Sequence, residues 1–179
     1  SAPVLEKAWA QRAGLGWRRK NSCFIIPRKG SFFFLGEIIT TARIIPDQAF
    51  EQDYCGSCTR CIDACPTGAI IEAGMLDARK CISCLTIEEK RILTKDETDS
   101  CKGWVFGCDI CQDVCPHNKY AQAHSEKKFM PLSPFLEWTE ADWGNINKAS
   151  FTAQFVKKAS PLSRAGYEKL REQIRHILL

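Results

Sequence analysis

The fold of the middle of the chain is determined by one stretch, Cys55-Gly56-Ser57-Cys58-Thr59-Arg60-Cys61-Ile62-Asp63-Ala64-Cys65-Pro66. Its first three cysteines are each separated by two residues, and a fourth follows after three more, directly before a proline. This is the spacing of bacterial ferredoxins, in which thiolates curl around a four-iron cluster. Gly56 and Ser57 are small, so the backbone can wrap closely and donate N–H groups to cluster sulfurs. The stretch therefore predicts an iron–sulfur cluster.

A second run, Cys108-Asp109-Ile110-Cys111-Gln112-Asp113-Val114-Cys115-Pro116, repeats the latter part of the first. Its opening cysteine is missing, because position 105 is valine. In two-cluster ferredoxins the last cysteine of each run ligates the other cluster. The first cluster is then expected to take Cys55, Cys58, Cys61 and Cys115. The second would take Cys65, Cys108, Cys111 and one of Cys81, Cys84 or Cys101, among which spacing does not choose.

The distribution of cysteine favours metal ligation over disulfides. The chain has 11 cysteines, an odd number, and ten of them lie between Cys55 and Cys115. A secreted disulfide scaffold would be shorter, with an even number of cysteines spread along it. Zinc ribbons pair two separated C-x₂-C knuckles, so the closely packed triple run argues against zinc. Two [4Fe–4S] clusters acting as an electron conduit are the prediction.

Composition sets the broad class. The 179 residues are 45% hydrophobic and 26% charged, with a net charge of +4, which is ordinary for a globular chain and too mildly basic to indicate nucleic-acid binding by itself. No apolar run approaches a transmembrane span, and the first residues lack the layout of a signal peptide. We therefore expect a cytoplasmic protein without membrane contact, and a monomer.

The flanks of the cysteine-rich part predict an α+β fold. Helical spacing of apolar residues within 1–20 predicts a helix that ends near Gly14. Residues 22–28 and 31–40 are expected to form two strands joined by a turn, and a helix is expected over residues 161–178. A lone hairpin needs more sheet to pack on, so residues 1–50 are interpreted as the end of a larger domain. A loop is expected around Pro131 and Pro134.

Beyond the cysteine runs, several segments resemble the epoxyqueuosine reductases, which are cobalamin-dependent iron–sulfur enzymes of tRNA modification. The resemblance extends from residue 1 to about residue 120, and less distinctly through Ser163-Arg164-Ala165-Gly166. The matching segments are Ser1-Ala2-Pro3-Val4-Leu5-Glu6, Ala13-Gly14-Leu15-Gly16-Trp17, Lys20-Asn21, Gly30-Ser31-Phe32-Phe33-Phe34-Leu35-Gly36-Glu37, Leu76-Asp77-Ala78-Arg79-Lys80-Cys81-Ile82-Ser83, Leu85-Thr86-Ile87-Glu88 and Gly107-Cys108-Asp109-Ile110-Cys111-Gln112-Asp113-Val114-Cys115-Pro116.

The resemblance implies a domain order. Residues 1–50 would be the C-terminal part of a cobalamin-binding α+β reductase domain, and residues 51–120 a ferredoxin-like domain with two [4Fe–4S] clusters. Residues 121–179 would be a mainly helical extension that packs on the rest. Cys81, which lies in the matching Cys-Ile-Ser motif, would be the eighth ligand.

The resemblance also implies an activity. Electrons from an external donor would pass through the clusters to cobalamin. Reduced cobalamin, the cofactor for this difficult step, would then remove the epoxide oxygen of epoxyqueuosine in the anticodon loop of a tRNA and leave queuosine.

Further site residues are implied in the same way. Lys20 and Asn21 would lie beside cobalamin, and Ser83 and Asp109 would face the corrin. The residues alone allow plainer roles: a loop preceding the next strand for the first pair, and turn caps or hydrogen bonds to cluster sulfurs for the second. Phosphates of a tRNA need Lys or Arg, and the candidates next to the motifs are Arg18, Arg19, Lys80 and Lys102.

Three departures from the family pattern bear on function. The family's proton-donor aspartate immediately precedes the Ser-Ala-Pro segment, so no catalytic residue is expected within this chain, which we interpret as a C-terminal portion. Arg19 replaces a usual glycine. Cys84 replaces a usual aromatic residue and is interpreted as a spare thiol rather than a ligand.

Two other function classes remain open from the sequence. One is a corrinoid-dependent reductase of another substrate, such as a reductive dehalogenase, which the sequence upstream would reveal. The other is a non-enzymatic dicluster ferredoxin module, which would have no affinity for cobalamin.

Overall fold

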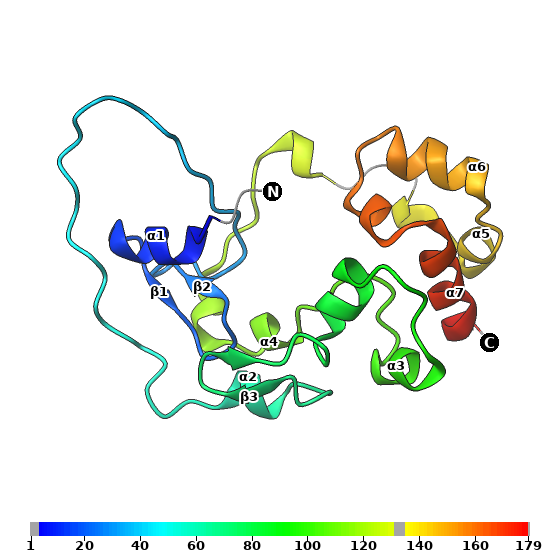
Figure 1. The fold of residues 1–179 in the computed structure, drawn as a ribbon, viewed down its shortest axis with the longest axis horizontal. Helices are drawn as coiled ribbons and strands as arrows, with labels where there is room; N and C mark the ends of the chain where they lie inside the picture. The colour runs from blue at the N-terminus through cyan, green and yellow to red at the C-terminus, as the bar shows by residue number, and fades with distance from the viewer. Residues whose placement is uncertain (1–3, 131–134, 179) are drawn as a thin grey trace. The chain divides into compact units, whose positions relative to one another are not determined.

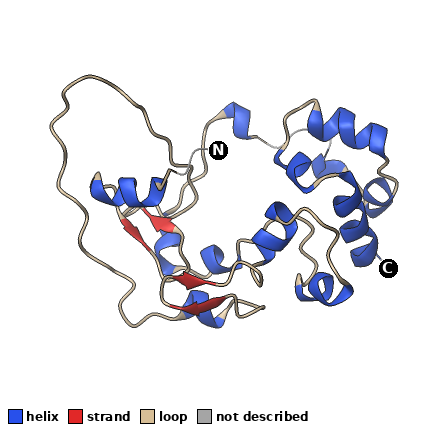
Figure 2. Cartoon of the chain, in the orientation of Figure 1, coloured by secondary structure: helices blue, strands red, loops and turns tan. Residues whose placement is uncertain are grey.

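The computed structural model describes residues 4–130 and 135–178 and divides the chain into two compact units. The first unit consists of Ser1–Asp77 with Asp109–Ala123, and the second of Ala78–Cys108 with His124–Leu179. Short helices and strands are joined by long irregular loops (Figures 1 and 2). Each unit thus combines two separate stretches of the chain. None of the helices in the described residues is long and apolar enough to cross a membrane.

The first unit holds two small antiparallel hairpins and several short helices. In one hairpin Trp17 pairs with Ile25, and in the other Ile70 pairs with Leu76. Trp17 and Ile25 are buried, at 2% and 0% exposure, because they face the interior of the unit. The elements are α1 (Glu6–Arg12), β1 (Trp17–Arg18), β2 (Phe24–Ile25), α2 (Arg60–Asp63), β3 (Ile70–Glu72), β4 (Met75–Leu76), α4 (Ile110–Asp113) and a 3₁₀-helix, Pro116–Tyr120.

The N-terminal helix is confirmed, but the expected pair of strands is wrong in part. The first expected strand, 22–28, contains β2, which pairs with β1 and not with residues 31–40. The turn is present, because Ile26 forms a bridge with Gly30. After Phe33, however, residues 34–49 form an extended loop, drawn from blue to cyan in Figure 1. A strand needs a hydrogen-bonded neighbour, and among the described residues no backbone hydrogen bond pairs residues 35–49 with another segment.

The second unit packs short helices around an aromatic core. Its buried side chains include Phe151, Phe155, Leu170 and Ile174. A smaller cluster contains Ile82, Leu85, Leu93 and Cys101. The elements are α3 (Lys95–Ser100), α5 (Glu140–Gly144), α6 (Lys148–Phe151), α7 (Tyr167–Leu178), π-helical turns at Cys84–Glu88 and Thr152–Val156, and 3₁₀-turns at Lys127–Phe129, Phe135–Glu137 and Pro161–Ala165.

The C-terminal helix is confirmed with one change. Residues 161–165 form a 3₁₀-turn, Gly166 has a φ of +80°, and α7 begins at Tyr167. The positive φ breaks the helix, and glycine adopts it without steric penalty. The apolar stripe faces the core, where Leu170 and Ile174 are 0% and 3% exposed. The loop expected around Pro131 and Pro134 falls on residues that lie outside the described part of the chain.

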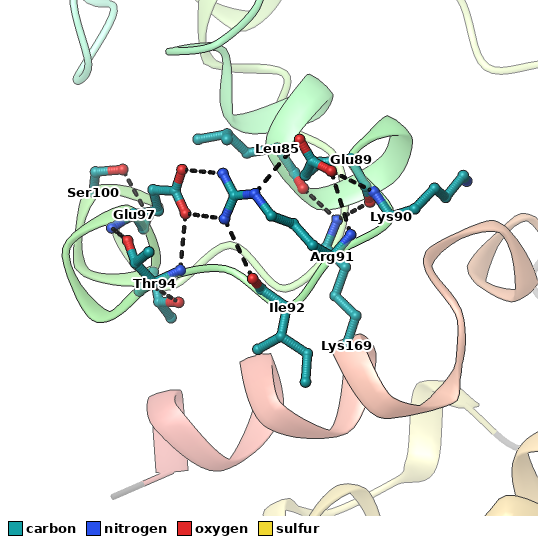
Figure 3. Close-up of polar contacts among 10 residues, drawn as sticks. Leu85, Glu89, Lys90, Arg91, Ile92, Thr94, Glu97, Ser100 and Lys169 are labelled. Carbon is teal, nitrogen blue, oxygen red and sulfur yellow. Dashed lines mark hydrogen bonds and ion pairs between the residues drawn. The ribbon is translucent and has the colours of Figure 1, made fainter.

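Polar contacts hold residues 85–100 against α7 (Figure 3). Lys169 is only 4% exposed and donates to the backbone carbonyls of Leu85 and Glu89. These carbonyls lie in and just after the π-helical turn, where backbone acceptors lack helical partners. Arg91 donates to both carboxylate oxygens of Glu97, at 2.7 and 2.6 Å. Glu97 also completes a capping box with Thr94 at the start of α3.

Candidate iron–sulfur site

Four thiols of the first unit border one cavity of about 50 Å³. They come from both cysteine runs, and all eleven cysteines of the chain are free thiols. Among the described residues, no three or more histidine, cysteine, aspartate or glutamate side chains are grouped so as to hold a single metal ion. The residues that line the cavity are Arg19, Lys20, Tyr54, Cys55, Cys58, Arg60, Cys61, Cys115, Pro116 and His117. The cavity thus brings together the four cysteines expected for the first cluster.

The two runs share a local fold that directs the thiols. Helix α2 begins at Arg60, between Cys58 and Cys61, and α4 begins at Ile110, between Cys108 and Cys111. A one-turn helix therefore contains the second cysteine of each repeated pair. Cys115 directly precedes Pro116, the first residue of a 3₁₀-helix. Proline suits this position because the N–H that it lacks would have no partner within the helix.

The electrostatics of the cavity suit thiolates only when a compensating positive charge is present. Burial raises the pKa of Cys61, the charge of Arg19 opposes this rise, and the neighbouring thiols of Cys55 and Cys115 add to it. Burial likewise raises the pKa of Cys55, while the indole N–H of Trp17 opposes the rise. Several thiolates in one place repel each other, so a positively charged iron centre between them would stabilise them.

Buried N–H groups lie around the thiols, and they indicate whether the cavity suits an iron–sulfur cluster. Among the described residues, Nε1 of Trp17 and Nε and Nη1 of Arg19 are buried and make no hydrogen bond of ordinary length and angle, although Trp17 influences the thiol of Cys55 and Arg19 that of Cys23. An unsatisfied buried donor costs about 1–3 kcal/mol, and more when it is charged. The sulfurs of an iron–sulfur cluster accept hydrogen bonds that tune it. The donors and the four-thiol cavity therefore fit such a group.

Lys20 braces the first cysteine loop from inside the unit. Its Nζ donates to the carbonyls of Gly56 at 2.6 Å and Cys58 at 3.0 Å. Its positive charge thus lies beside the backbone that carries two of the four thiols. This placement differs from the plain loop role that the sequence allowed.

Asn21 braces the second run in a similar way. Its Nδ2 donates to the carbonyl of Cys111 at 2.9 Å, and its Oδ1 accepts from the N–H of Cys23. The thiols of Cys23 and Cys111 share a hydrogen bond, which lowers the pKa of Cys23 and raises that of Cys111. If Cys111 binds metal as a thiolate, Cys23 becomes the donor of that hydrogen bond.

The other cysteines expected for the second cluster are divided between the units. Cys65 belongs to the first, where burial would raise its pKa but hydrogen bonds from Thr67 and from the N–H of Ala69 lower it. Ala69 donates to the sulfur at 3.3 Å. Cys81 and Cys108 belong to the second unit, where Ser83 Oγ donates to the carbonyl of Cys108 at 3.2 Å.

Cys84 and Cys101 also lie in the second unit. Cys84 is half-buried, and burial together with the nearby thiol of Cys81 raises its pKa. Cys101 is 0% exposed within the small core cluster. A buried thiol of this kind behaves as a small apolar side chain.

The remaining predicted site residues differ in exposure. Arg18, Lys80 and Lys102 are exposed. Arg19 is only 3% exposed, so its expected role as a phosphate contact is corrected: a guanidinium enclosed among cysteines has no surface to offer a tRNA. Asp109 is exposed and accepts from Gln112 Nε2 at 2.6 Å.

Sequence reasoning missed an aromatic group beside the cavity. The Trp17 ring lies 5.6 Å from Phe50, 5.2 Å from Tyr54 and 5.1 Å from His117, measured between centroids. His117 is half-buried in this group. The aromatic residues come from three separate segments, so only their proximity to the cysteine runs could have suggested them.

The site defines the class of this protein. Residues 54–118 match the family model described as "4Fe-4S double cluster binding domain", and these residues contain all ten clustered cysteines. The middle of the chain is therefore a double-cluster iron–sulfur domain.

Comparison with known proteins finds similarity to epoxyqueuosine reductases. The chain is 45% identical to the epoxyqueuosine reductase of Cyclobacterium marinum, covering 99% of this chain and 56% of that protein. It is 46% identical to that of Synechocystis sp., covering 90% and 57%. Its fold resembles the epoxyqueuosine reductase of Bacillus subtilis, with a TM-score of 0.87 at 34% identity over 99% of this chain and 47% of the other.

A further similar structure is a crystal structure of epoxyqueuosine reductase with an epoxyqueuosine-modified tRNA-Tyr stem loop. Its TM-score is 0.85 at 34% identity, covering 97% of this chain and 45% of that one. The chain is similar to epoxyqueuosine reductases over almost its whole length, and it spans about half the length of the relatives it matches.

Proposed function

We propose that this chain is the iron–sulfur electron-transfer part of an epoxyqueuosine reductase. The observation that carries the proposal is the four-cysteine cavity with its unsatisfied buried N–H donors. The first [4Fe–4S] cluster would be held by Cys55, Cys58, Cys61 and Cys115. The second would be held by Cys65, Cys81, Cys108 and Cys111.

Within this proposal, the chain's own residues shape the environment of the clusters. Lys20 fixes the loop that carries Cys55 and Cys58 by binding two of its carbonyls. The rings of Phe50 and Tyr54 pack on the buried Trp17 beside the thiols, where they would shield one side of the cluster from water. Exclusion of water and a fixed loop keep the geometry constant while the charge changes, which favours rapid electron transfer.

Cobalamin is the proposed electron acceptor. When bound, it would supply the strongly reducing centre that removes the epoxide oxygen of epoxyqueuosine. The candidate contacts are Lys20, Asn21, Ser83 and Asp109. Three of them already hold the backbone of a cysteine loop, since Lys20, Asn21 and Ser83 donate to carbonyls of Cys58, Cys111 and Cys108. They are therefore suited to hold a cofactor and a cluster loop in a constant relation.

The proposed substrate is a tRNA with epoxyqueuosine in its anticodon loop, as in the related structure that contains such a stem loop. Exposed Arg18, Lys80 and Lys102 are the candidate phosphate contacts. We also propose an external electron donor, a monomeric state, and location in the cytoplasm, where tRNA is modified.

The extended loop supports the proposal that residues 1–50 belong to a larger domain. Ile38, Ile39 and Ile45 are 93%, 100% and 92% exposed. An apolar segment with free backbone groups is a template for strand pairing. The half of the relatives that this chain does not match is the proposed partner, and it would contain the cobalamin domain and the proton donor.

Metal and cofactor analysis tests the proposed function. We would reconstitute the chain anaerobically and measure iron, acid-labile sulfide, zinc and cobalamin. About eight irons and eight sulfides are expected. Zinc that persists after reconstitution would overturn the cluster assignment. Cobalamin affinity that appears only when the upstream half is present would support the reductase, and its absence in both forms would favour a ferredoxin module.

A further inference from the structure

The turn between β1 and β2 holds a buried cation, Arg19, which supplies two of the buried N–H donors at the proposed cluster site. Arg19 is 3% exposed. Its Nη2 donates to Ser31 Oγ at 3.1 Å, but within the described part of the chain Nε and Nη1 make no hydrogen bond of ordinary length and angle. Among the described residues no carboxylate forms an ion pair with it. A buried guanidinium without a counter-charge is costly, because burial removes its hydration.

The surroundings of Arg19 point to an anionic partner made of sulfur. Its side chain borders the cavity that Cys55, Cys58, Cys61 and Cys115 line. A cluster bound by four thiolates carries net negative charge and exposed sulfide acceptors.

The Arg19 side chain is also held in place through Ser31, the residue that accepts its one hydrogen bond. Ser31, which accepts from Arg19, donates to Gln112 Oε1 at 2.8 Å and accepts from Asn118 Nδ2 at 3.0 Å. The N–H of Ser31 donates to Asn118 Oδ1 at 2.7 Å. Gly30 permits this close approach, because a Cβ there would lie 2.3 Å from Asn118 Oδ1. The guanidinium is thus anchored through the second cysteine run and cannot easily turn to solvent.

We propose that Arg19 tunes the cluster held by Cys55, Cys58, Cys61 and Cys115, by donating N–H···S hydrogen bonds to it and by placing a buried positive charge beside it. The inference rests on the proposed cluster assignment. Reduction adds negative charge to the cluster, so a neighbouring cation and N–H donors favour the reduced state and raise the reduction potential. Arg19 is therefore a tuning residue for electron transfer.

Redox titration of the reconstituted chain, followed by electron paramagnetic resonance, tests the inference. Arg19→Gln keeps an amide donor but removes the charge, and Arg19→Lys keeps the charge but removes the planar fork. At the midpoint potential of the unchanged chain, Arg19→Gln is expected to lower the ratio of reduced to oxidised cluster about tenfold, which is 59 mV for a one-electron couple. Arg19→Lys keeps the positive charge, so its midpoint potential is expected to be lowered by less than half as much as that of Arg19→Gln.

Arg18→Gln is the matched control. It removes the same charge one residue away, but from an exposed side chain that water and salt screen. Its expected change in the ratio is less than about twofold. An Arg19→Gln chain with full iron and sulfide and an unchanged potential would overturn the inference. A chain that never binds clusters, with or without the substitution, would instead overturn the proposed function.

A second measurement detects the hydrogen bonds directly, and it can be made even when a variant contains less than its full complement of iron. The chain is labelled with arginine carrying ¹⁵N in the guanidinium, and pulsed paramagnetic resonance is recorded on the reduced cluster. A ¹⁵N coupling that disappears in Arg19→Lys is expected. No coupling, or one that persists in Arg19→Lys and so comes from another arginine such as Arg60 at the same cavity, would contradict the hydrogen bonds.

Discussion

Lys20 Nζ lies 3.0 Å from the carbonyl oxygen of Cys58, so a side chain of the N-terminal hairpin region holds the cysteine loop 38 residues further along the chain. A second bond from the same nitrogen reaches Gly56. The loop therefore does not depend on the cluster alone for its shape. This relation explains why a lysine within a turn would matter for metal binding.

Replacing Lys20 with methionine is expected to lower the free energy of unfolding by about 1–2 kcal/mol, because two charge-assisted hydrogen bonds are lost from a partly buried site. Iron should also be released faster to a chelator. Chemical denaturation and chelator kinetics measure the two effects. Lys29→Met, at an exposed position, is the control. Equal behaviour of both variants would show that the bonds to Gly56 and Cys58 are unimportant.

Cys81→Ser is expected to reduce iron from about eight to about four per chain, because the second cluster loses a ligand. Cys84→Ser should leave about eight, since Cys84 is interpreted as a spare thiol. Iron and sulfide analysis of the reconstituted variants distinguishes the two cysteines. The opposite pattern would make Cys84 the eighth ligand.

Lys169→Met is expected to lower the free energy of unfolding by about 2–3 kcal/mol. The variant leaves the carbonyls of Leu85 and Glu89 without the donor that now satisfies them. Urea denaturation followed by circular dichroism measures the change. Lys157→Met, at an exposed lysine, should change stability by less than about 0.5 kcal/mol, and a similar loss in both variants would contradict the prediction.

Glu97 makes the stability of the second unit depend on acid pH. Its pKa is lowered to about 2, from a usual 4.5, chiefly by hydrogen bonds from Arg91 and the N–H of Thr94. Because the folded pKa is the lower one, the ionised group stabilises the fold above about pH 4.5, and this contribution disappears as the pH falls towards 2.

Glu97→Gln should therefore cost about 1 kcal/mol near pH 7, since the pair is partly exposed, and almost nothing near pH 2. Thermal unfolding of both chains across this range measures the difference. Glu72→Gln, at an exposed strand residue, serves as the control. A difference that stays constant with pH would contradict the role given to the Arg91–Glu97 pair.

The exposed loop leads to a prediction about the larger domain. Ile39→Ser should change the stability of this chain by less than about 0.5 kcal/mol, whereas Ile25→Ser, at a fully buried position, should cost about 3 kcal/mol or more. In a chain extended by the upstream half, amides of residues 34–45 should become protected from hydrogen exchange. Unchanged exchange there would contradict the proposed pairing.

How far the sequence could be interpreted depends on how local each feature is. The N-terminal helix follows from spacing over a few residues, and the structure has this helix. The expected strand at 31–40 failed, because an apolar run predicts a strand only when a neighbouring strand is present, and the described residues provide none. Gly166 split the C-terminal helix for a local reason that the periodicity of apolar residues does not reveal.

The sequence by itself determined the iron–sulfur class, because ligand spacing within a short loop limits which metal group the thiols can surround. Only the tertiary structure decided which polar side chains attend the thiols. Arg19 and Lys20 are adjacent and both basic, yet one is enclosed without a counter-charge and the other caps two carbonyls. Their roles depend on contacts with residues 31, 56 and 58. Such long-range contacts arise from the packing of the whole unit and leave no periodic signal in the chain.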